Sequence, residues 1–410
     1  MKIVVQKYGG TSLATQESRA RVCEIISQTL AEGYKAAVVV SAIGRAGDPY
    51  ATDTLINLMR AVNPQPDPRE LDLVISCGEL ISGIILSSQL NAMGIRARFL
   101  SGAEAGLVTD GNYGNAHILY VHPKNVLECL EEEIVPVIAG FQGLSQEGGL
   151  TTLGRGGSDT TASALGVALN ADFIDIFTDV DGIMTADPRI VSNARLLSAI
   201  TYNEICQLAR DGAKVIHPRA VEIAMQRGIP LRVRSTFSDS TGTLVSHQTM
   251  FYQEDVSIIR DALITGVTYT SNIAQIRIDN FDLRQETDLP LRVFKTLADA
   301  SISVDFISVQ PESIMFTVAA ENALQAKQAL LEVGFKPGMD VNCAKVAIVG
   351  AAMTGIPGVM ARTVEALAEY QIPILQSGDS YTNIWCLVKR EHMEQAVRAL
   401  HDKFELGKNI

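Results

Sequence analysis

The sequence lacks the features that mark secreted, metal-binding or membrane proteins. Its six cysteines form no CxxC pair and have no zinc-finger spacing with a histidine. We therefore expect buried, reduced thiols in a cytoplasmic protein. No charged-then-apolar leader precedes the opening "MKIVVQ", and the apolar run Ala36–Ile43 is far shorter than the ~20 residues of a membrane span. We expect no membrane partner.

The common nucleotide and hydrolase motifs are also missing. Gly149 and Gly154 have Walker A spacing, but Arg155-Gly156 follows where Lys-Ser/Thr is required, and GxGxxG fails because Asp159 takes the place of its last glycine. "TDVDG" begins like a calcium loop but lacks the later ligands. There is no GxSxG and no HExxH. These absences exclude the usual ways of holding a triphosphate.

The composition indicates a globular protein of more than one domain. A chain of 410 residues with 47% hydrophobic and 20% charged residues is longer than one core usually supports. The formal net charge of −12 argues against a nucleic-acid partner, which would need a basic face. A local cluster of Arg and Lys can still bind a small anion.

Strand and helix patterns alternate through the first two-thirds of the chain, which predicts an α/β sandwich with helices on both faces of a parallel sheet. The expected strands are Ile3–Val5, Ala36–Ala42, "RARFL", "IVPVIAG" and "DFIDIFTD", and the expected helices cover about Gln16–Glu32, Arg69–Met93, a stretch from Lys124 and a stretch after Gly157.

A domain boundary is expected at Ser238–Asp255, where apolar periodicity lapses. Beyond it "LADASISV" and "LAEYQIPI" recur 70 residues apart, each after a helical pattern and before a strand. Two tandem βαββαβ units explain this repeat. The alternative is two unrelated α+β segments that share eight loosely similar residues.

Two glycine loops are candidate anion sites. In "KYGGTS", Gly9 and Gly10 allow close backbone approach, Lys7 supplies charge and Ser12 a hydroxyl, which favours phosphate over a plain Gly-Gly turn. In "LGRGGSDTTASAL", Arg155 offers a fork suited to a carboxylate. A well-capped helix would explain Ser158 and Asp159 there, but not an arginine between glycines.

Three further positions remain open from the residues alone. The acidic pair in "TDVDGIMTADPR" suits a ribose or magnesium, or else consists of solvated turn carboxylates. Glu79 stands within an apolar stretch and is either functional or a surface or salt-bridged residue. His217 in "VIHPRA" is interpreted as structural.

Together, "KYGGTS", "GFQG", "TTLGRGGSDTTA", "TDVDGIMTADPR" and "PLRVRST" resemble aspartate kinase of the amino-acid kinase superfamily, over essentially the whole chain. The resemblance implies a three-layer α/β sandwich over residues 1–245, followed by two ferredoxin-like α+β ACT regulatory modules over 263–338 and 344–410. "ILQSGDSYTNIWCLV" further resembles the diaminopimelate-sensitive aspartokinase I subclass.

The resemblance also implies the site. ATP with Mg²⁺ would lie over the first loop, with Lys7 and Asp159 catalytic, and L-aspartate would contact the second loop and Glu79. No protein-held metal is expected. The implied nucleotide residues are Lys7, Gly9, Gly10, Ser12, Ser41, Thr178, Asp179, Met184, Asp187, Arg189 and Lys214, and the implied aspartate residues are Thr52, Glu79, Arg155, Gly156, Gly157 and Ser158.

The implied product is 4-phospho-L-aspartate, on the route to diaminopimelate, lysine, threonine and methionine, under amino-acid feedback. Where the second module has Pro357-Gly358, the first has Thr287-Asp288, a helix-capping pair. This puts the first effector site in doubt and makes Gln376, Ser377 and Asn383 further candidates. We expect a homodimer or larger assembly, because ACT modules pair through open sheet edges. An internal start at Met250 would give a free regulatory subunit.

Three rivals compete with this hypothesis. Another small-acid kinase of the superfamily, of acetylglutamate or glutamate type, would lack the "RGGSDTTA" block and the ACT tail. A fused homoserine dehydrogenase would need a Rossmann loop after residue 245, and none is present. A catalytically dead amino-acid sensor would not keep Lys7, Glu79, Arg155 and Asp159 together.

Overall fold

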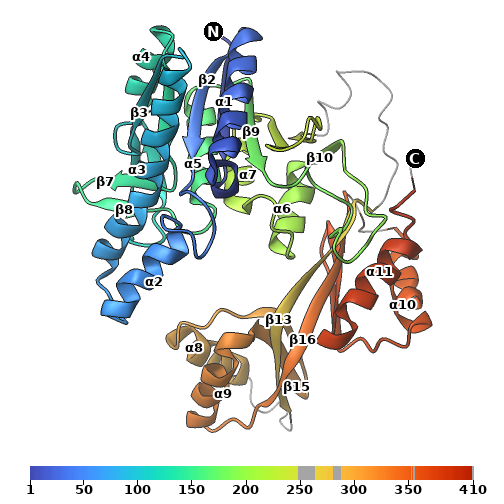
Figure 1. Ribbon diagram of the computed structural model, residues 1–410. Coiled ribbons are helices and arrows are strands. Elements are labelled where there is room, and N and C mark those ends of the chain that lie inside the picture. Colours follow the sequence, from blue (N-terminus) through green and yellow to red (C-terminus); the bar gives the residue numbers. More distant parts are fainter. Residues whose placement is uncertain (248–263, 280–287, 352, 354–355, 409–410) are drawn as a thin grey trace. The chain divides into compact units, whose positions relative to one another are not determined.

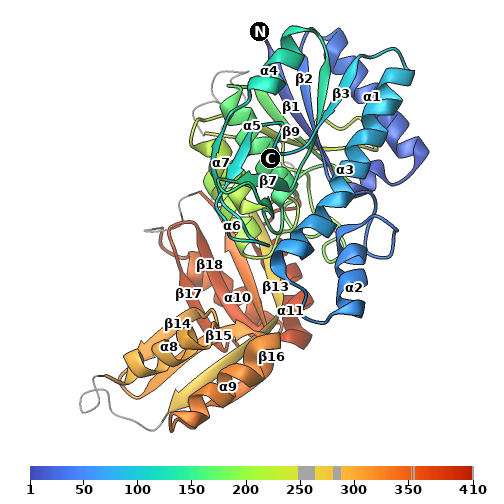
Figure 2. The same cartoon turned by 90° about the vertical axis from the view of Figure 1, so that its left-hand side faces the viewer.

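The computed structural model describes residues 1–247, 264–279, 288–351, 353 and 356–408, and Figures 1 and 2 show its course in two views. The described chain divides into two compact units. The first comprises Met1–Ile183, Leu196–Ala209 and residues 214–247, and the second comprises Met184–Arg195, Arg210–Ala213 and the residues from 264 on. The predicted positions Met250 and Thr287 lie outside the described residues.

An eight-stranded sheet forms the centre of the first unit, and only its β11–β12 pair is antiparallel. Its inner strands are apolar and β-branched, as expected where both faces are covered. In spatial order the strands are β10 (Ala199–Thr201), β12 (Thr243–Ser246), β11 (Leu231–Ser235), β9 (Phe173–Thr178), β1 (Ile3–Tyr8), β2 (Lys35–Val40), β6 (Val135–Ala139) and β3 (Ala97–Leu100).

Helices cover both faces of this sheet, and the alternation along β1 shows how. Tyr8 packs in one core with α1 (Gln16–Ala31) and α3 (Pro68–Ala92), and Gln6 bonds to Thr29 of α1. Lys7, between them, points to the opposite face, where α5 (Gly157–Ala168) lies. The first unit is therefore a three-layer α/β sandwich, as predicted.

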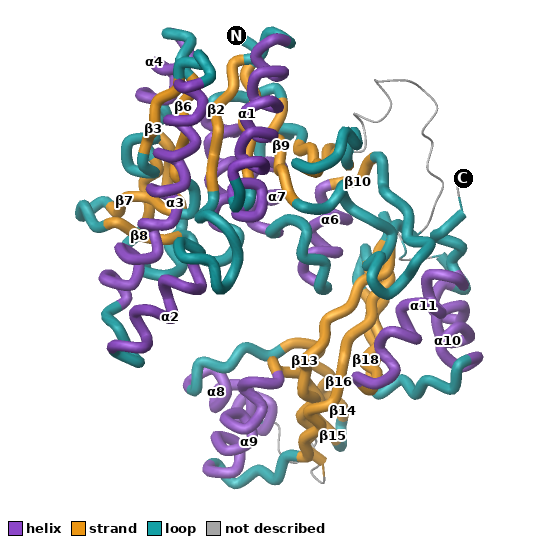
Figure 3. Tube along the Cα trace, in the orientation of Figure 1, coloured by secondary structure: helices purple, strands orange, loops and turns teal. Residues whose placement is uncertain are grey.

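Smaller elements complete the first unit. A separate four-stranded sheet has the order β5 (Ile118–Val121), β4 (Leu107–Thr109), β7 (Gln142–Ser145) and β8 (Leu150–Thr152). The remaining helices are α2 (Thr52–Val62), α4 (Lys124–Glu131), α6 (Tyr202–Arg210) and α7 (Pro218–Met225), with the short 3-10 turn η1 (Gly10–Leu13) after β1. Figure 3 separates these helices from the strands. The alternating pattern did not predict α2 or the small sheet.

Helix α3 is the one described helix that is long and apolar enough to cross a membrane by length and composition. Half of that apolar window is buried inside the protein. Its buried residues include Asp72 and Glu79, and it contacts β2, β3, β6 and β8. A core helix of a globular unit has these properties.

The second unit is built on one six-stranded antiparallel sheet. Its strands, in spatial order, are β14 (Asp305–Gln310), β15 (Ser313–Ala319), β13 (Gly266–Asp279), β16 (Gly338–Val349), β18 (Asn383–Lys389) and β17 (Gln376–Asp379). Strands β13 and β16 are long and run through both halves of the sheet, with a register shift at Asn272, where φ is +64°. The two predicted modules therefore share strands, and β16 spans the gap left between residues 338 and 344.

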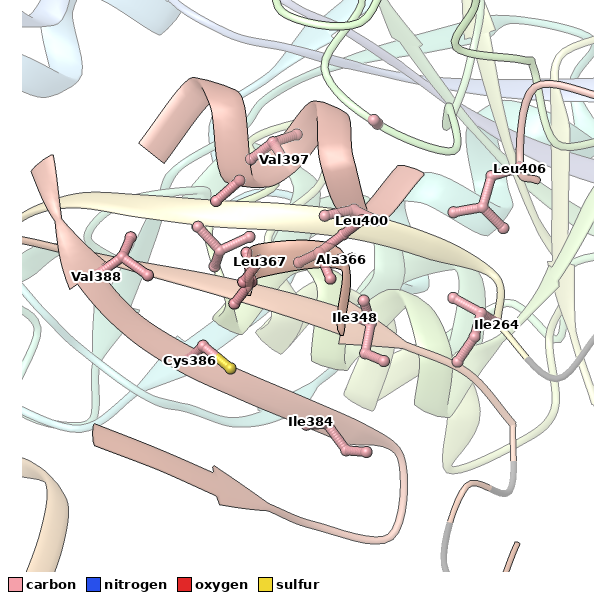
Figure 4. Close-up of a cluster of buried hydrophobic side chains, with 14 of the residues drawn as sticks. Ile264, Ile348, Ala366, Leu367, Ile384, Cys386, Val388, Val397, Leu400 and Leu406 are labelled. Atoms are coloured by element: carbon pink, nitrogen blue, oxygen red, sulfur yellow. The ribbon is translucent and has the colours of Figure 1, made fainter. Parts of the chain in front are cut away.

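Each half of this sheet has its own pair of helices and its own core. Helices α8 (Leu289–Asp299) and α9 (Ala323–Glu332) pack on the half that contains β15, around Phe316 and Ile276. Helices α10 (Val359–Glu369) and α11 (Met393–Lys403) pack on the other half, around Ile348 and Leu400 (Figure 4). The repeated strand–helix pattern in the sequence is confirmed as two α+β halves of one sheet.

Two segments from the first 245 residues belong to the second unit. Within Met184–Arg195, Ala186 and Val191 join the core of α10 and α11, and the Thr185 hydroxyl bonds to His401 at 3.0 Å. The four residues Arg210–Ala213 lie against β13, where Thr270 donates to the Asp211 carbonyl at 2.9 Å. The predicted boundary near residue 245 did not anticipate these segments.

The cysteines are free, as expected, but one departs from the expected burial. Cys23, Cys129, Cys206, Cys343 and Cys386 are buried, whereas Cys77 is exposed on α3. The Cys77 side chain points in a different direction around the helix axis from those of Asp72, Ser76 and Glu79. It therefore lies outside the buried face of α3.

Candidate active site

The centre of the site is an ion pair between Lys7 and Asp159. The Lys7 Nζ atom lies 2.7 Å from Asp159 Oδ1, and both side chains are close to nine-tenths buried. Lys7 comes from the carboxyl end of β1 and Asp159 from the first turn of α5. The helix begins at the N-cap residue Gly156, so Asp159 does not cap the helix and its carboxylate is directed to the lysine instead.

Three parallel strands end beside this pair. Tyr8 of β1 is in register with Val40 of β2 and with Phe177 of β9. The segments that begin at Gly9, Ser41 and Thr178 therefore leave the sheet at the same edge. Ligands bind at this carboxyl edge in α/β sheets. The structure thus brings the segment at Gly9 beside the segment at Thr178, although the two are far apart in the sequence.

The first loop packs closely against the segment that follows β2. A Cβ atom on Gly10 would lie 2.4 Å from the Gly44 carbonyl oxygen, so only glycine fits there. Gly9 has no such restriction, because its nearest neighbours would be 3.7 Å away. The Ser12 hydroxyl is fully buried and bonds to Thr236 at 2.7 Å, which ties the loop to the residue after β11.

The segment after β9 begins with Thr178 and Asp179. The Thr178 hydroxyl donates to the Asp179 carboxylate at 3.1 Å, and the other oxygen of that carboxylate pairs with Arg45. Arg45 follows β2 and was not predicted. The only sequence signal for Arg45 is its place directly after "SAIG", the segment that follows β2.

Glu79 is the predicted substrate residue with the most unusual surroundings. It is 2% exposed, and its Oε1 atom accepts a bond from the Ala42 backbone N–H at 3.0 Å. The Oε2 atom is buried without any hydrogen-bond partner among the described residues. Burial raises the pKa of the Glu79 carboxyl to about 8. Glu79 is therefore not a surface residue and forms no salt bridge among the described residues, so that alternative does not hold.

The second loop, Leu153–Ser158, presents Arg155 to solvent. Gly156 adopts a left-handed conformation with φ +67°, and Ser158 is buried against Gly140. Within the described part of the chain, the Arg155 guanidinium has no carboxylate partner. Thr52 begins α2 and is partly buried.

Four further predicted nucleotide residues lie beyond these strand-end segments along the chain. Met184, Asp187 and Arg189 belong to the second unit, where Asp187 accepts bonds from Arg189 at 2.7 Å and from the Tyr269 hydroxyl at 3.1 Å. The bonds from Arg189 lower the pKa of Asp187. Lys214 lies in the first unit and is exposed.

The predicted effector residues make internal contacts in the second unit. Asn383 is buried and donates to the Asp211 carboxylate at 2.7 Å, and Gln376 donates to the Phe306 carbonyl. Ser377 is exposed on the edge strand β17. Asp288 occupies the N-cap position of α8, but its side chain makes no capping bond.

Sequence reasoning missed two side chains that support the second loop. Asp72, fully buried on α3, accepts bonds from the Thr152 N–H and hydroxyl at 2.8 and 2.7 Å. Arg219 donates to the Leu153 carbonyl at 3.0 Å. The only sequence signal for Asp72 is that an acidic residue stands within an apolar helical pattern.

The sequence and the fold match known proteins along the whole chain. The model of the amino acid kinase family matches residues 2–235, and that of the ACT domain matches residues 339–402. Aspartokinase 1 of Bacillus subtilis (strain 168) is 48% identical over 413 residues, covering 100% of both chains. An aspartokinase of Thermus thermophilus is 41% identical over 419 residues, again covering 100% of both.

Solved structures agree with these relatives. The crystal structure of E. coli aspartokinase III in complex with aspartate and ADP has a TM-score of 0.80 and 27% identity, over 98% of this chain and 99% of that one. A second structure of that enzyme, with lysine and aspartate, has a TM-score of 0.76. The chain therefore belongs to the amino acid kinase family, and within it to the aspartokinases.

Proposed function

We propose that the edge at Lys7 and Asp159 transfers the γ-phosphoryl group of ATP to the β-carboxylate of L-aspartate, the reaction of the aspartokinases. One observation supports this above all. The Lys7–Asp159 ion pair lies at the carboxyl end of β1, where two glycine loops begin or end. The product is 4-phospho-L-aspartate, on the route to diaminopimelate, lysine, threonine and methionine.

The nucleotide is assigned to the first loop. Gly9 and Gly10 would let the backbone approach a phosphate closely, and Lys7 supplies a positive charge beside them. Thr178, the last residue of the neighbouring strand β9, and Asp179 after it are assigned to the nucleoside. The remaining assigned residues are Ser12, Ser41, Met184, Asp187, Arg189 and Lys214.

L-Aspartate is assigned to Glu79 and to the second loop. The unpartnered Oε2 atom of Glu79 would accept from the substrate ammonium, and the exposed Arg155 fork would bind its α-carboxylate. Gly156, Gly157 and Ser158, at the beginning of α5, are assigned to the same carboxylate, because a helix N-terminus favours negative charge. Thr52 is assigned to the same substrate.

The chemistry requires placement and charge neutralisation rather than a general base. A β-carboxylate with a pKa near 4 is already an anion at pH 7 and can attack directly. The protein must then hold it in line with the γ-phosphoryl group and stabilise negative charge there. Lys7 does this through its ammonium, and Asp159 fixes the position of that ammonium at 2.7 Å.

Mg²⁺ would accompany the nucleotide. The described residues contain no cluster of three or more His, Cys, Asp or Glu side chains that could hold a metal alone. Mg²⁺ bound with a nucleotide usually keeps phosphate and water oxygens as ligands. When bound, Mg²⁺ neutralises charge on the phosphates. We assign no protein ligand to it.

Feedback control is proposed for the second unit. E. coli aspartokinase III, a similar structure, has been solved with lysine and aspartate, and an ACT domain model matches residues 339–402 here. We propose an amino-acid effector there, in a cytoplasmic homodimer or larger assembly of the diaminopimelate-sensitive subclass. Domain limits of 1–245, 263–338 and 344–410 remain our prediction.

A coupled assay of ADP release tests the proposed reaction. The purified full chain, with MgATP, is expected to turn over aspartate and not glutamate or N-acetylglutamate. Turnover of either other acid above that of aspartate would contradict the substrate assignment. Adding lysine, threonine or meso-diaminopimelate to the same assay then identifies the effector, and meso-diaminopimelate is the expected inhibitor.

A further inference from the structure

The first turn of α7 presents two side chains to the second loop. His217 is the N-cap residue and Pro218 begins the helix, a favoured start because proline needs no N–H partner there. The His217 Nδ1 atom accepts from the Arg219 N–H at 3.4 Å. A neutral imidazole that accepts at Nδ1 carries its proton on Nε2. Burial lowers the pKa of His217, which favours this neutral form.

Arg219 holds the beginning of the loop. Its two terminal nitrogens donate to different backbone carbonyls, to Leu153 at 3.0 Å and to Ala116 at 2.9 Å. Leu153 immediately precedes Gly154, so the guanidinium fixes the backbone from which the loop leaves β8. A planar guanidinium can donate to two such acceptors at once, whereas a lysine ammonium is a single point.

His217 holds the middle of the same loop. A Cβ atom on Gly156 would lie 2.3 Å from His217 Cβ and 2.4 Å from Cγ. No side chain at position 156 fits into that space, and the left-handed φ of +67° also favours glycine. The imidazole therefore forms a wall against which the backbone between Arg155 and Ser158 turns.

We propose that His217 and Arg219 are positioning residues for the amino-acid substrate, which set the direction of Arg155 by clamping the Leu153–Ser158 loop. This rests on the proposed function, in which that loop binds aspartate. Neither residue touches the reacting atoms in this assignment. Their effect is on aspartate binding, because a displacement of about 1 Å in a positioning group can cost a large factor in rate or affinity.

Arg219 is tested by two variants that keep different parts of the side chain. Arg219→Lys keeps the charge, and Arg219→Met keeps the apolar stem, but neither can bridge the two carbonyls. Both are expected to raise KM for aspartate by about tenfold, with KM for ATP within a factor of two of the wild type. Equal increases in both KM values, or no increase in either, would overturn the proposal.

His217 is tested by a double-mutant cycle with Gly156. Gly156→Ala alone places a methyl group against the imidazole and is expected to raise KM for aspartate strongly. His217→Gly removes that wall and keeps a residue that N-caps tolerate. In the His217→Gly background, Gly156→Ala should raise KM for aspartate several-fold less than in the wild type. Independent effects of the two substitutions would refute the contact as the source of positioning.

Arg155→Ala, measured in parallel, separates this proposal from the proposed function. A large increase in KM for aspartate in Arg155→Ala, with none in the Arg219 variants, overturns the clamp and leaves the function in place. An unchanged KM in Arg155→Ala overturns the assignment of the loop to aspartate, and the clamp with it. If KM for aspartate rises both in Arg155→Ala and in the Arg219 variants, at constant KM for ATP, the clamp and the proposed function are both supported.

Discussion

The Lys345 ammonium lies 2.5 Å from the Asp211 carboxylate in the second unit, and both side chains are more than nine-tenths buried. The other carboxylate oxygen of Asp211 accepts from Asn383 at 2.7 Å. Lys345 also lies over the Phe306 ring, 4.1 Å from its centroid. This pair anchors Arg210–Ala213, which lead along the chain to Lys214 and His217. Lys345 and Asp211 are 134 positions apart in the sequence.

Removing one partner of this pair should destabilise the second unit. Lys345→Met leaves the Asp211 carboxylate buried without its cation, which typically costs about 3–5 kcal/mol. Urea unfolding followed by Trp385 fluorescence measures this, because Trp385 is the single tryptophan and its ring lies 6.0 Å from Lys345 Nζ. The control Lys345→Met/Asp211→Asn removes both charges and should recover most of the loss. A double variant as unstable as Lys345→Met would contradict this account.

Lys7→Ala should lower kcat far more than it raises KM for aspartate. The ammonium is held beside the transferring group by Asp159, so its loss affects the transition state most. Loss of one such electrostatic group commonly costs about 10²–10³ in kcat. Steady-state kinetics with both substrates give the answer, and Asp159→Asn should change kcat in the same direction. A loss confined to KM would be incompatible with a catalytic role.

Aspartate binding should strengthen as pH rises toward about 8. The carboxyl of Glu79, with a pKa of about 8, is neutral below that pH when the site is empty, whereas the substrate ammonium needs a carboxylate. Binding at lower pH must therefore release a proton. We expect KM for aspartate to fall between pH 6 and pH 8, and Glu79→Gln to have a higher KM with no such slope. A wild-type KM that is constant over this range would exclude the model.

The Glu79 carboxyl should also lower the free energy of unfolding at high pH. The folded-state pKa of Glu79 is raised above its value of 4.5 in an unfolded chain, so its contribution is present at low pH and is lost as pH rises through about 8. Each pKa unit corresponds to about 1.4 kcal/mol. Glu79→Gln should thus unfold at a higher temperature than the wild type at pH 8.5, with a smaller difference at pH 5. Calorimetry at the two pH values tests the sign.

The sequence predicted the local structure of the first unit well, because its signals are local. Continuous β-branched runs such as 36–40 and helix stops such as Gly33 require only neighbouring residues to be interpreted. The two glycine loops were found for the same reason. Helix α2 was missed, and it is a helix that buries none of its residues.

Contacts between distant positions could not be predicted from such signals. Nothing near Asp211 indicates Lys345, and nothing near Gly156 indicates that His217, interpreted only as structural, forms its wall. The same limit applies to the Met184–Arg195 segment, which was assigned by its motif to the nucleotide and which clusters with the second unit.

The sequence by itself predicted the main alternation of strands and helices in the first unit, and it marked two glycine loops as candidate anion sites. Periodicity and glycine placement act over a few residues, so they can be recognised without the fold. The tertiary structure decided which groups meet. It pairs Lys7 with Asp159, leaves one oxygen of Glu79 buried without a partner among the described residues, and brings α7 against the Leu153–Ser158 loop. Those depend on how strands pair and helices pack, and burial then sets the charge state that each group can keep.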